Sequence, residues 1–145
     1  MEKVELSWLP VPGKILIFAD KTQINRLFTN LLQNATEACH DKDVCKIRIS
    51  EQLNEDQVLI RISDNGEGIP EQMQSKIFIP NFTTKSSGTG LGLAMSKTIV
   101  EQAKGKIWFE TEEDSGTTFF VELPIYDETF QPDFHNVVPH VRDEL

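Results

Sequence analysis

One stripe of apolar residues at helical spacing constrains the fold of this chain more than any other feature. Between Thr22 and about Cys39, apolar residues recur every three or four positions, as in a helix with one buried face. The stripe consists of Ile24, Leu27, Phe28, Leu31, Leu32, Ala35 and Ala38. Asp20 stands just before it, where a helix N-cap belongs. The segment is therefore predicted to be an amphipathic helix with Asp20 as its N-cap.

Strand patterns follow this helix. Two segments in which apolar and polar residues alternate, 47–50 and 58–63, are joined by the polar link 54–56 and are predicted to form a hairpin. Two further strands are expected at 106–112 and 117–123, with a turn at 113–116 between them. The chain is thus expected to combine helices with paired strands.

The remaining elements have shorter patterns. The stretch up to Ala19 is strand-like, with a turn at 10–13, and a short helix is possible near 71–77. A second long helix is predicted over 91–104. Gly105 then stands where a helix commonly ends in a left-handed glycine.

Composition narrows the function classes. The chain has 145 residues, 39% of them hydrophobic, which suits one domain with an ordinary core. The net charge of −9 disfavours a nucleic-acid-binding domain. No stretch approaches the roughly 20 apolar residues of a membrane span, and the first residues lack the pattern of a signal peptide. We therefore expect a cytoplasmic chain without direct membrane contact.

Two local features complete the description of the chain. Cys39 and Cys45 lie six positions apart with no second pair, and they are predicted to be free buried thiols of a cytosolic protein. Residues 127–145 carry five acidic residues and one basic residue and show no periodicity. We predict a domain at 1–126, followed by an acidic tail that is mobile or loosely packed.

The long helix carries the first candidate for chemistry. Asn30 and Asn34 are four residues apart and therefore share one helical face, within an otherwise apolar stripe. An amide oxygen is a suitable ligand for Mg²⁺, which takes few protein ligands beside water and phosphate. Two solvent-facing amides are the alternative.

Two glycine-containing segments are the other candidates. The segment 64–70 (Asp-Asn-Gly-Glu-Gly-Ile-Pro) directly follows a predicted strand. A carboxylate only accepts hydrogen bonds, so Asp64 could accept a hydrogen bond from the exocyclic amine of adenine. The alternative is a turn capped by Asp64.

The segment 88–93 (Gly-Thr-Gly-Leu-Gly-Leu) opens a predicted helix, where backbone amides bind phosphate oxygens. It matches neither the P-loop nor the dinucleotide-binding spacing.

Together, in this order, these segments resemble the ATP-binding catalytic domain of bacterial sensor histidine kinases, of the superfamily of gyrase, heat-shock chaperone and mismatch-repair ATPases. The resemblance covers roughly 20–124. It comprises an N box at 27–35, a G1 box at 64–68, an F box at 77–85 and a G2 box at 88–93. It implies an α+β two-layer sandwich, the Bergerat fold, in which a mixed, mostly antiparallel sheet has helices on one face.

The resemblance also implies roles for the motif residues. Asn34 would ligate Mg²⁺ at the phosphates of ATP, with Asn30 as a second candidate ligand. Asp64 would hold the adenine amine, with help from a water and Thr117. Gly66 and Gly68 would let the following segment start without touching the nucleotide.

The segment 69–87 would form the ATP lid, anchored by Phe78 and Phe82 when it closes. Lys85 is a candidate cation for the γ-phosphate, and a solvated lysine is an equal alternative. The other nucleotide contacts implied for the lid and the G2 box are Phe82, Thr84, Gly88, Thr89, Gly90, Leu91, Gly92 and Leu93. The F box departs from the family pattern at Ile79 and Asn81, which concerns lid packing.

Asn30 distinguishes among the activities of the superfamily. Relatives that hydrolyse ATP or phosphorylate serine resemble each other in carrying a glutamate here as general base, whereas an imidazole acceptor needs less activation. The resemblance therefore favours transfer of the γ-phosphoryl of MgATP to a histidine, within two-component signalling. The alternatives are an ATPase or serine kinase of the superfamily, and a non-catalytic nucleotide-sensing or docking module.

The expected phosphoacceptor is absent from this chain. Its histidines, His40, His135 and His140, are predicted to be ordinary surface or structural residues. The partners implied are a histidine-bearing dimerisation domain of the same parent protein and a response regulator receiver domain. The chain is expected to be a monomeric fragment, because the family dimerises through the missing helices, and the parent protein can be membrane-anchored.

Overall fold

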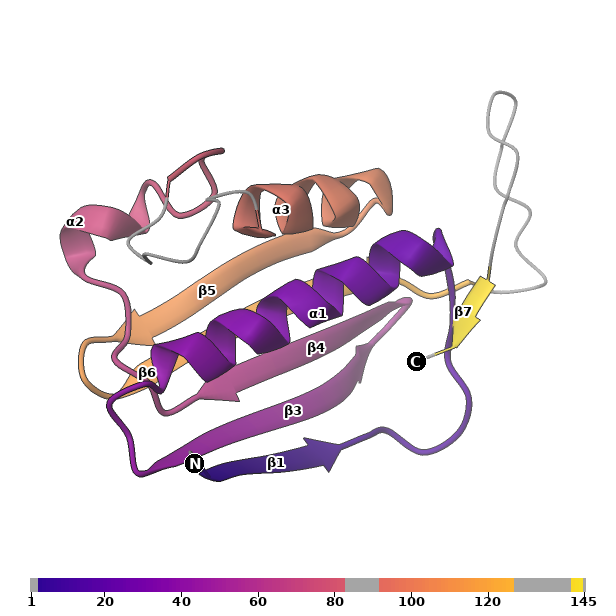
Figure 1. Ribbon diagram of the computed structural model, residues 1–145. Helices are drawn as coiled ribbons and strands as arrows, with labels where there is room; N and C mark the ends of the chain where they lie inside the picture. Colours follow the sequence, from indigo (N-terminus) through magenta and orange to yellow (C-terminus); the bar gives the residue numbers. More distant parts are fainter. Residues whose placement is uncertain (1–2, 83–91, 127–141, 145) are drawn as a thin grey trace.

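The computed structural model, which describes residues 3–82, 92–126 and 142–144, has two layers. A five-stranded sheet forms one layer and the helices lie on one of its faces (Figure 1). Across the sheet the strands are β1 (Lys3–Leu9), β3 (Val44–Asn54), β4 (Gln57–Asp64), β6 (Gly116–Pro124) and β5 (Lys106–Glu112). β1 is parallel to β3, and every other pair is antiparallel. The predicted α+β sandwich with a mixed, mostly antiparallel sheet is confirmed.

The two longer helices cover the middle of this sheet. α1 (Lys21–Ala38) and α3 (Gly92–Gln102) lie side by side, whereas α2 (Glu71–Gln74) is a single turn. Asp20 caps α1, because its side chain accepts a hydrogen bond of 3.2 Å from the Gln23 N–H, as predicted. The buried stripe of α1 joins the inward residues of β4 in one hydrophobic core: Ile24, Leu27, Leu31, Ala35, Val58, Ile60 and Ile62.

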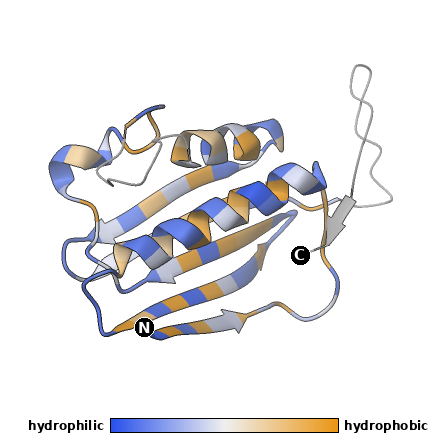
Figure 2. Cartoon of the chain, viewed as in Figure 1, coloured by the Kyte–Doolittle hydropathy of each residue, from blue (hydrophilic) through white to orange (hydrophobic). Residues whose placement is uncertain are grey.

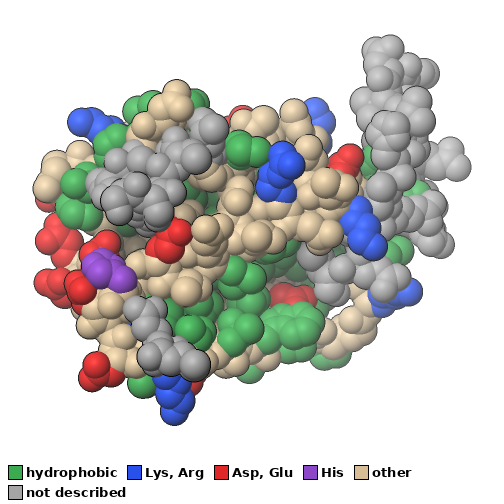
Figure 3. Space-filling view, viewed as in Figure 1, with side chains coloured by type: hydrophobic (Ala, Val, Ile, Leu, Met, Phe, Trp, Pro, Cys, Tyr) green, Lys and Arg blue, Asp and Glu red, His purple; other side chains and the backbone are tan. Residues whose placement is uncertain are grey.

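Among the described elements, none covers the β1 edge of the sheet. Val4, Leu6 and Trp8 pair in register with the inward residues of β3, so they lie on the same face as α1. They remain between 46% and 61% exposed. Apolar and polar residues alternate along β1 and β3 (Figure 2), and hydrophobic side chains gather on the surface beside α1 (Figure 3).

A smaller sheet lies near the start of α1 (Figure 1). β2 (Leu16–Phe18) pairs antiparallel with β7 (Arg142–Glu144), and Ile17 also bridges to Ile125. Of the acidic segment 127–145, for which a mobile or loosely packed tail is predicted, the structure describes only these three residues of β7. The division of the chain at residue 126 therefore stays a prediction.

Both cysteines are buried, as predicted, but the prediction that they are free thiols is wrong. Cys39 and Cys45 form a disulfide, with their Cα atoms 5.3 Å apart. Cys39 is the C-cap of α1, and Cys45 is the second residue of β3. The spacing in the sequence did not reveal the pair, because the turn between the helix and the strand brings the two side chains together.

The end of α3 also differs from the prediction. The left-handed residue there is Lys104, with φ of 65°, and not Gly105. Gly105 N–H still donates to the Val100 carbonyl at 2.9 Å, as a helix C-terminus requires. A Cβ at Gly105 would overlap the carbonyl oxygen of Glu122, so the glycine is needed for close contact with β6.

Candidate functional site

Asp64 is the last residue of β4, and its carboxylate is held by the backbone. It pairs in register with the buried Ile47, so its side chain lies on the face that the helices cover. One carboxylate oxygen, Oδ1, accepts hydrogen bonds from the N–H groups of Gly66 at 2.8 Å and Thr117 at 3.3 Å. These two hydrogen bonds fix the orientation of the carboxylate.

The loop after Asp64 passes close to other backbone segments. A Cβ at Gly66 would overlap the carbonyl of Ala38 at the end of α1, and one at Gly68 would overlap the Glu112 carbonyl. Gly68 also has φ of 74°. Between them, Glu67 donates its N–H to Ala38 O at 2.9 Å and accepts from Asp114 N at 2.8 Å. These glycines therefore have a packing reason within the protein, and their proposed place beside a nucleotide stays a prediction.

Asn65 holds the loop beside Asp64 in place, and the sequence analysis did not single it out. Its Oδ1 accepts from the Lys46 N–H at 2.8 Å, and its Nδ2 donates to the Val44 carbonyl at 3.1 Å. The side chain thus ties the loop to the start of β3, directly beside Asp64. The available signal was an asparagine just after a strand, since asparagine commonly hydrogen-bonds to nearby backbone in turns.

Thr111 is a second residue that the sequence analysis missed. It pairs in register with Thr117, and their hydroxyl oxygens are 2.8 Å apart. The Thr111 hydroxyl also accepts from the Ile69 N–H at 2.9 Å and lies 3.2 Å from the Gly116 carbonyl oxygen. The expected turn at 113–116 obscured this pair, because the hairpin closes between Glu112 and Gly116.

The two N-box asparagines lie on the helix face that meets α3. Asn30 is half-buried, and its Nδ2 donates to the Gly92 carbonyl at 3.3 Å, at the start of α3. The side-chain nitrogen of Asn34 is buried. Neither amide is therefore a fully solvent-facing group, and the N box is joined to the end of the G2 box.

In the described part of segment 69–87, the predicted ATP lid, the first aromatic residue packs against the sheet and α3. Phe78 packs on Phe109 of β5, with ring centroids 6.0 Å apart, and Lys97 of α3 lies over its ring. At the two departures from the family pattern, Ile79 is 51% exposed and Asn81 has φ of 68°. Asparagine is one of the few residues that adopt this left-handed conformation readily.

The other predicted contacts can be placed only in part. Phe82 is half-buried, and Gly92 and Leu93 are half-buried in the first turn of α3. The remaining lid and G2-box residues lie outside the described residues: Thr84, Lys85, Gly88, Thr89, Gly90 and Leu91.

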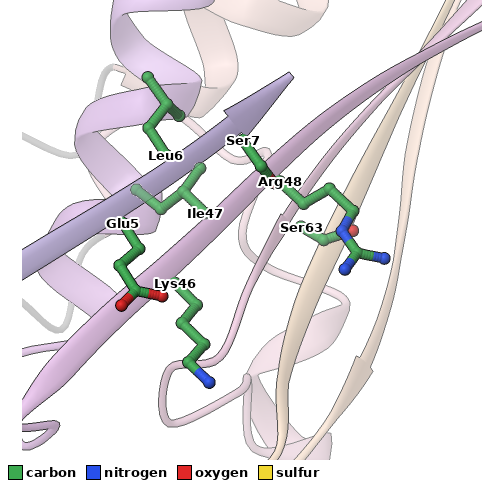
Figure 4. A pocket seen from close by; sticks show the side chains of 7 residues that line it. All are labelled: Glu5, Leu6, Ser7, Lys46, Ile47, Arg48 and Ser63. Atoms are coloured by element: carbon green, nitrogen blue, oxygen red, sulfur yellow. The ribbon is translucent and has the colours of Figure 1, made fainter. Parts of the chain in front are cut away.

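Other surface features do not coincide with the predicted site. A hollow at the β1 edge is lined by Glu5, Leu6, Ser7, Lys46, Ile47, Arg48 and Ser63 (Figure 4), and it includes no predicted site residue.

His40 is exposed, as predicted, and its Nε2 lies 3.2 Å from Asp41 and 4.0 Å from Glu67. His135 and His140 lie outside the described residues. Within the described ranges, no helix is both long and apolar enough to cross a lipid bilayer.

Comparisons with known proteins identify the family of this chain. The family model described as "Histidine kinase-, DNA gyrase B-, and HSP90-like ATPase" matches residues 19–127. The signal transduction histidine-protein kinase AtoS of Escherichia coli is 44% identical over 110 residues, and sporulation kinase E of Bacillus subtilis is 38% identical over 109. The matches cover 75% of this chain in both cases, but only 18% and 15% of those relatives.

A solved structure gives the same result in three dimensions. The catalytic domain of histidine kinase ThkA, in a nucleotide-free form, superposes with a TM-score of 0.73 and is 37% identical. That likeness covers 83% of this chain and 78% of the ThkA chain. The chain therefore belongs to the histidine kinase-, DNA gyrase B- and HSP90-like ATPase family, and it corresponds to the catalytic domain of a sensor histidine kinase.

Proposed function

We propose that this chain binds MgATP and donates its γ-phosphoryl group to a histidine on a separate dimerisation domain of a longer sensor kinase. The phosphoryl group then passes to a response regulator receiver domain in two-component signalling. We place the reaction in the cytoplasm, with or without a membrane anchor in the parent protein. The observation that carries the proposal is the Asp64 carboxylate, held by two backbone N–H groups on the helix-covered face of the sheet.

The carboxylate favours adenine for an electrostatic reason. It offers only acceptors, and adenine presents an exocyclic amine that donates hydrogen bonds. Guanine presents an oxygen at the same place, and two acceptors facing each other in a partly buried site are unfavourable. Because Gly66 and Thr117 fix the carboxylate, it cannot easily turn away from the wrong base.

The N-box asparagines fit a hard cation bound to phosphate. Their amide oxygens are the neutral oxygen ligands that Mg²⁺ accepts beside water and phosphate. Asn34 is the proposed ligand, and Asn30, tied to Gly92 at the start of α3, supports it. Bound Mg²⁺ would neutralise charge that develops on the transferred phosphoryl group.

Asn30 argues against the rival activities. A carboxylate at this position could accept a proton from water or from a serine hydroxyl, but an amide cannot do so near neutral pH. The Asn30 amide also donates to the Gly92 carbonyl. A neutral histidine nitrogen needs no such base to attack in line, so this site supports histidine as the acceptor.

Two measurements test the proposal. Calorimetric titration with ATP, with and without Mg²⁺, should show binding that Asn34→Ala weakens about tenfold or more, mainly in Mg²⁺. Asn25→Ala is the matched control, since Asn25 is exposed on the same helix, and it should leave the affinity unchanged. A histidine-bearing dimerisation domain from a relative, added with γ-labelled ATP, should become phosphorylated.

The alternatives predict other results. A docking or sensing module would bind ATP and never label the acceptor. An ATPase would release phosphate at the same rate with and without the acceptor. Failure of a well-folded chain to bind any nucleotide would overturn the proposal.

A further inference from the structure

We propose that Thr111 is a positioning residue that directs the Thr117 hydroxyl toward ring nitrogen N1 of adenine, and so adds to the preference for ATP over nucleotides that carry a proton at N1. The inference rests on the proposed function, because it concerns the same adenine site. Nothing in the motif pattern assigns a role to Thr111, which lies in β5 outside all four boxes.

Three polar groups converge on the Thr111 hydroxyl. The Ile69 N–H donates to it at 2.9 Å, the Gly116 carbonyl oxygen lies at 3.2 Å, and the Thr117 hydroxyl lies at 2.8 Å. Thr117 is only 5% exposed. The hydroxyl of Thr111 therefore connects the start of the proposed lid to the residue whose backbone N–H holds Asp64.

Thr111 and Thr117 have one hydroxyl hydrogen each, and this limits how the hydrogen bonds between them can be arranged. Each hydroxyl has one hydrogen to donate and can accept two hydrogen bonds. Thr111 accepts from Ile69, so its own hydrogen goes either to Gly116 O or to the Thr117 oxygen. In the first arrangement Thr117 donates to Thr111. In the second, Thr111 donates to Thr117, and the hydrogen of Thr117 becomes available to a ligand.

The second arrangement matches adenine. In adenine the ring nitrogen N1 next to the exocyclic amine is an acceptor, whereas in guanine and hypoxanthine it carries a hydrogen. Asp64 supplies an acceptor for the amine, and Thr117, bonded to Asp64 through its N–H, supplies a donor for N1, either directly or through one water. Thr111 is needed because a hydrogen bond that it donates to the Thr117 oxygen leaves the Thr117 hydrogen pointing away from Thr111 and toward the ligand.

The test combines a residue change with a change of one ligand atom. Thr111→Val removes the hydroxyl at nearly constant volume, and 1-deaza-ATP replaces N1 by a C–H group. By calorimetric titration, T111V should weaken ATP binding by about fivefold or more and change 1-deaza-ATP binding by less than about twofold. Thr111→Ser, which keeps the hydroxyl, should restore the affinity for ATP.

A matched control lies on the other face of the sheet. Thr118 makes a similar hydroxyl pair with Ser63, at 2.8 Å, so Thr118→Val should affect neither ligand. Thr111→Ala serves as the second variant if T111V does not fold by circular dichroism. Equal weakening of ATP and 1-deaza-ATP would overturn the inference and show that Thr111 only supports the loop at Ile69, while ATP binding itself still stands. Absence of ATP binding to the unchanged chain would instead overturn the proposed function.

Discussion

Two regions of the sheet, the end of the central strand β4 around Asp64 and the β1 edge, differ in how firmly they are packed. Around Asp64, carboxylate, amide and hydroxyl groups bind backbone atoms, and the glycines press against carbonyl oxygens. In β1, which forms one edge of the sheet, all seven residues are exposed, and three of them are large and apolar on the helix side of the sheet. The same sheet thus has one region whose geometry is closely fixed and an edge strand whose side chains contribute little packing.

This difference in packing indicates that the candidate function depends on the region around Asp64 and not on the β1 edge. The Asp64 end positions a carboxylate to within hydrogen-bonding geometry, and this needs neighbours that cannot shift. The β1 edge is held mainly through its pairing with β3. Substitutions of the same type should therefore have very different effects in the two regions.

The largest difference is expected for leucines. Leu27 of α1 is fully buried, whereas Leu6 of β1 is 61% exposed. Leu27→Ala should lower the free energy of unfolding by about 2–5 kcal/mol, because it leaves a cavity. Leu6→Ala should change it by about 0.5 kcal/mol or less. Urea unfolding followed by circular dichroism measures both, and similar losses would contradict the account of the β1 edge.

Glycines offer a second comparison. Gly116 has φ of 128°, and a Cβ there would overlap the Asp64 carbonyl oxygen, whereas Gly13, with φ of 86°, has no atom within 4 Å of an added Cβ. Gly116→Ala should cost about 2–4 kcal/mol, from backbone strain and overpacking together. Gly13→Ala should cost about 1–2 kcal/mol, from backbone strain alone. Thermal unfolding of the two variants measures both losses of stability. Equal losses would mean that the backbone around Asp64 can shift to make room for the added Cβ.

The smallest of the three effects is expected for Asn65. Asn65→Ala leaves the Lys46 N–H and the Val44 carbonyl without their side-chain partner. It should cost about 1–3 kcal/mol in unfolding free energy and weaken ATP binding, because the loop beside Asp64 loosens. Gln52→Ala is the control, since its amide bonds to Asn54 and Arg61 on the surface. Unchanged stability and ATP affinity in the Asn65 variant would show that the Asn65 side-chain hydrogen bonds are dispensable.

The sequence predicts the elements that have strong periodicity. The α1 stripe and its Asp20 cap are found where they are expected, and the hairpin link at 54–56 lies at the turn between β3 and β4. These patterns are local, and each is the direct result of burying one face of a helix or strand. The residue types of the G1 box also led to Asp64 as the central carboxylate.

The missed features depend on contacts between distant segments. Thr111 meets Thr117 because the β5–β6 hairpin closes one residue away from the expected turn. A shift by one residue reverses the face of every side chain in a strand. The Cys39–Cys45 disulfide and the role of Gly105 against β6 likewise depend on three-dimensional packing. None of these leaves a periodic signal in the sequence.

The central claim is that Asp64 selects adenine, and one titration tests it most directly. ATP and GTP are compared on the unchanged chain, on Asp64→Asn and on Asp56→Asn, a control in the exposed β3–β4 turn. The account predicts that ATP binds at least about tenfold more tightly than GTP, that Asp64→Asn removes most of this difference and that Asp56→Asn keeps it. Equal binding of ATP and GTP to the unchanged chain, or an unchanged preference in Asp64→Asn, would contradict it.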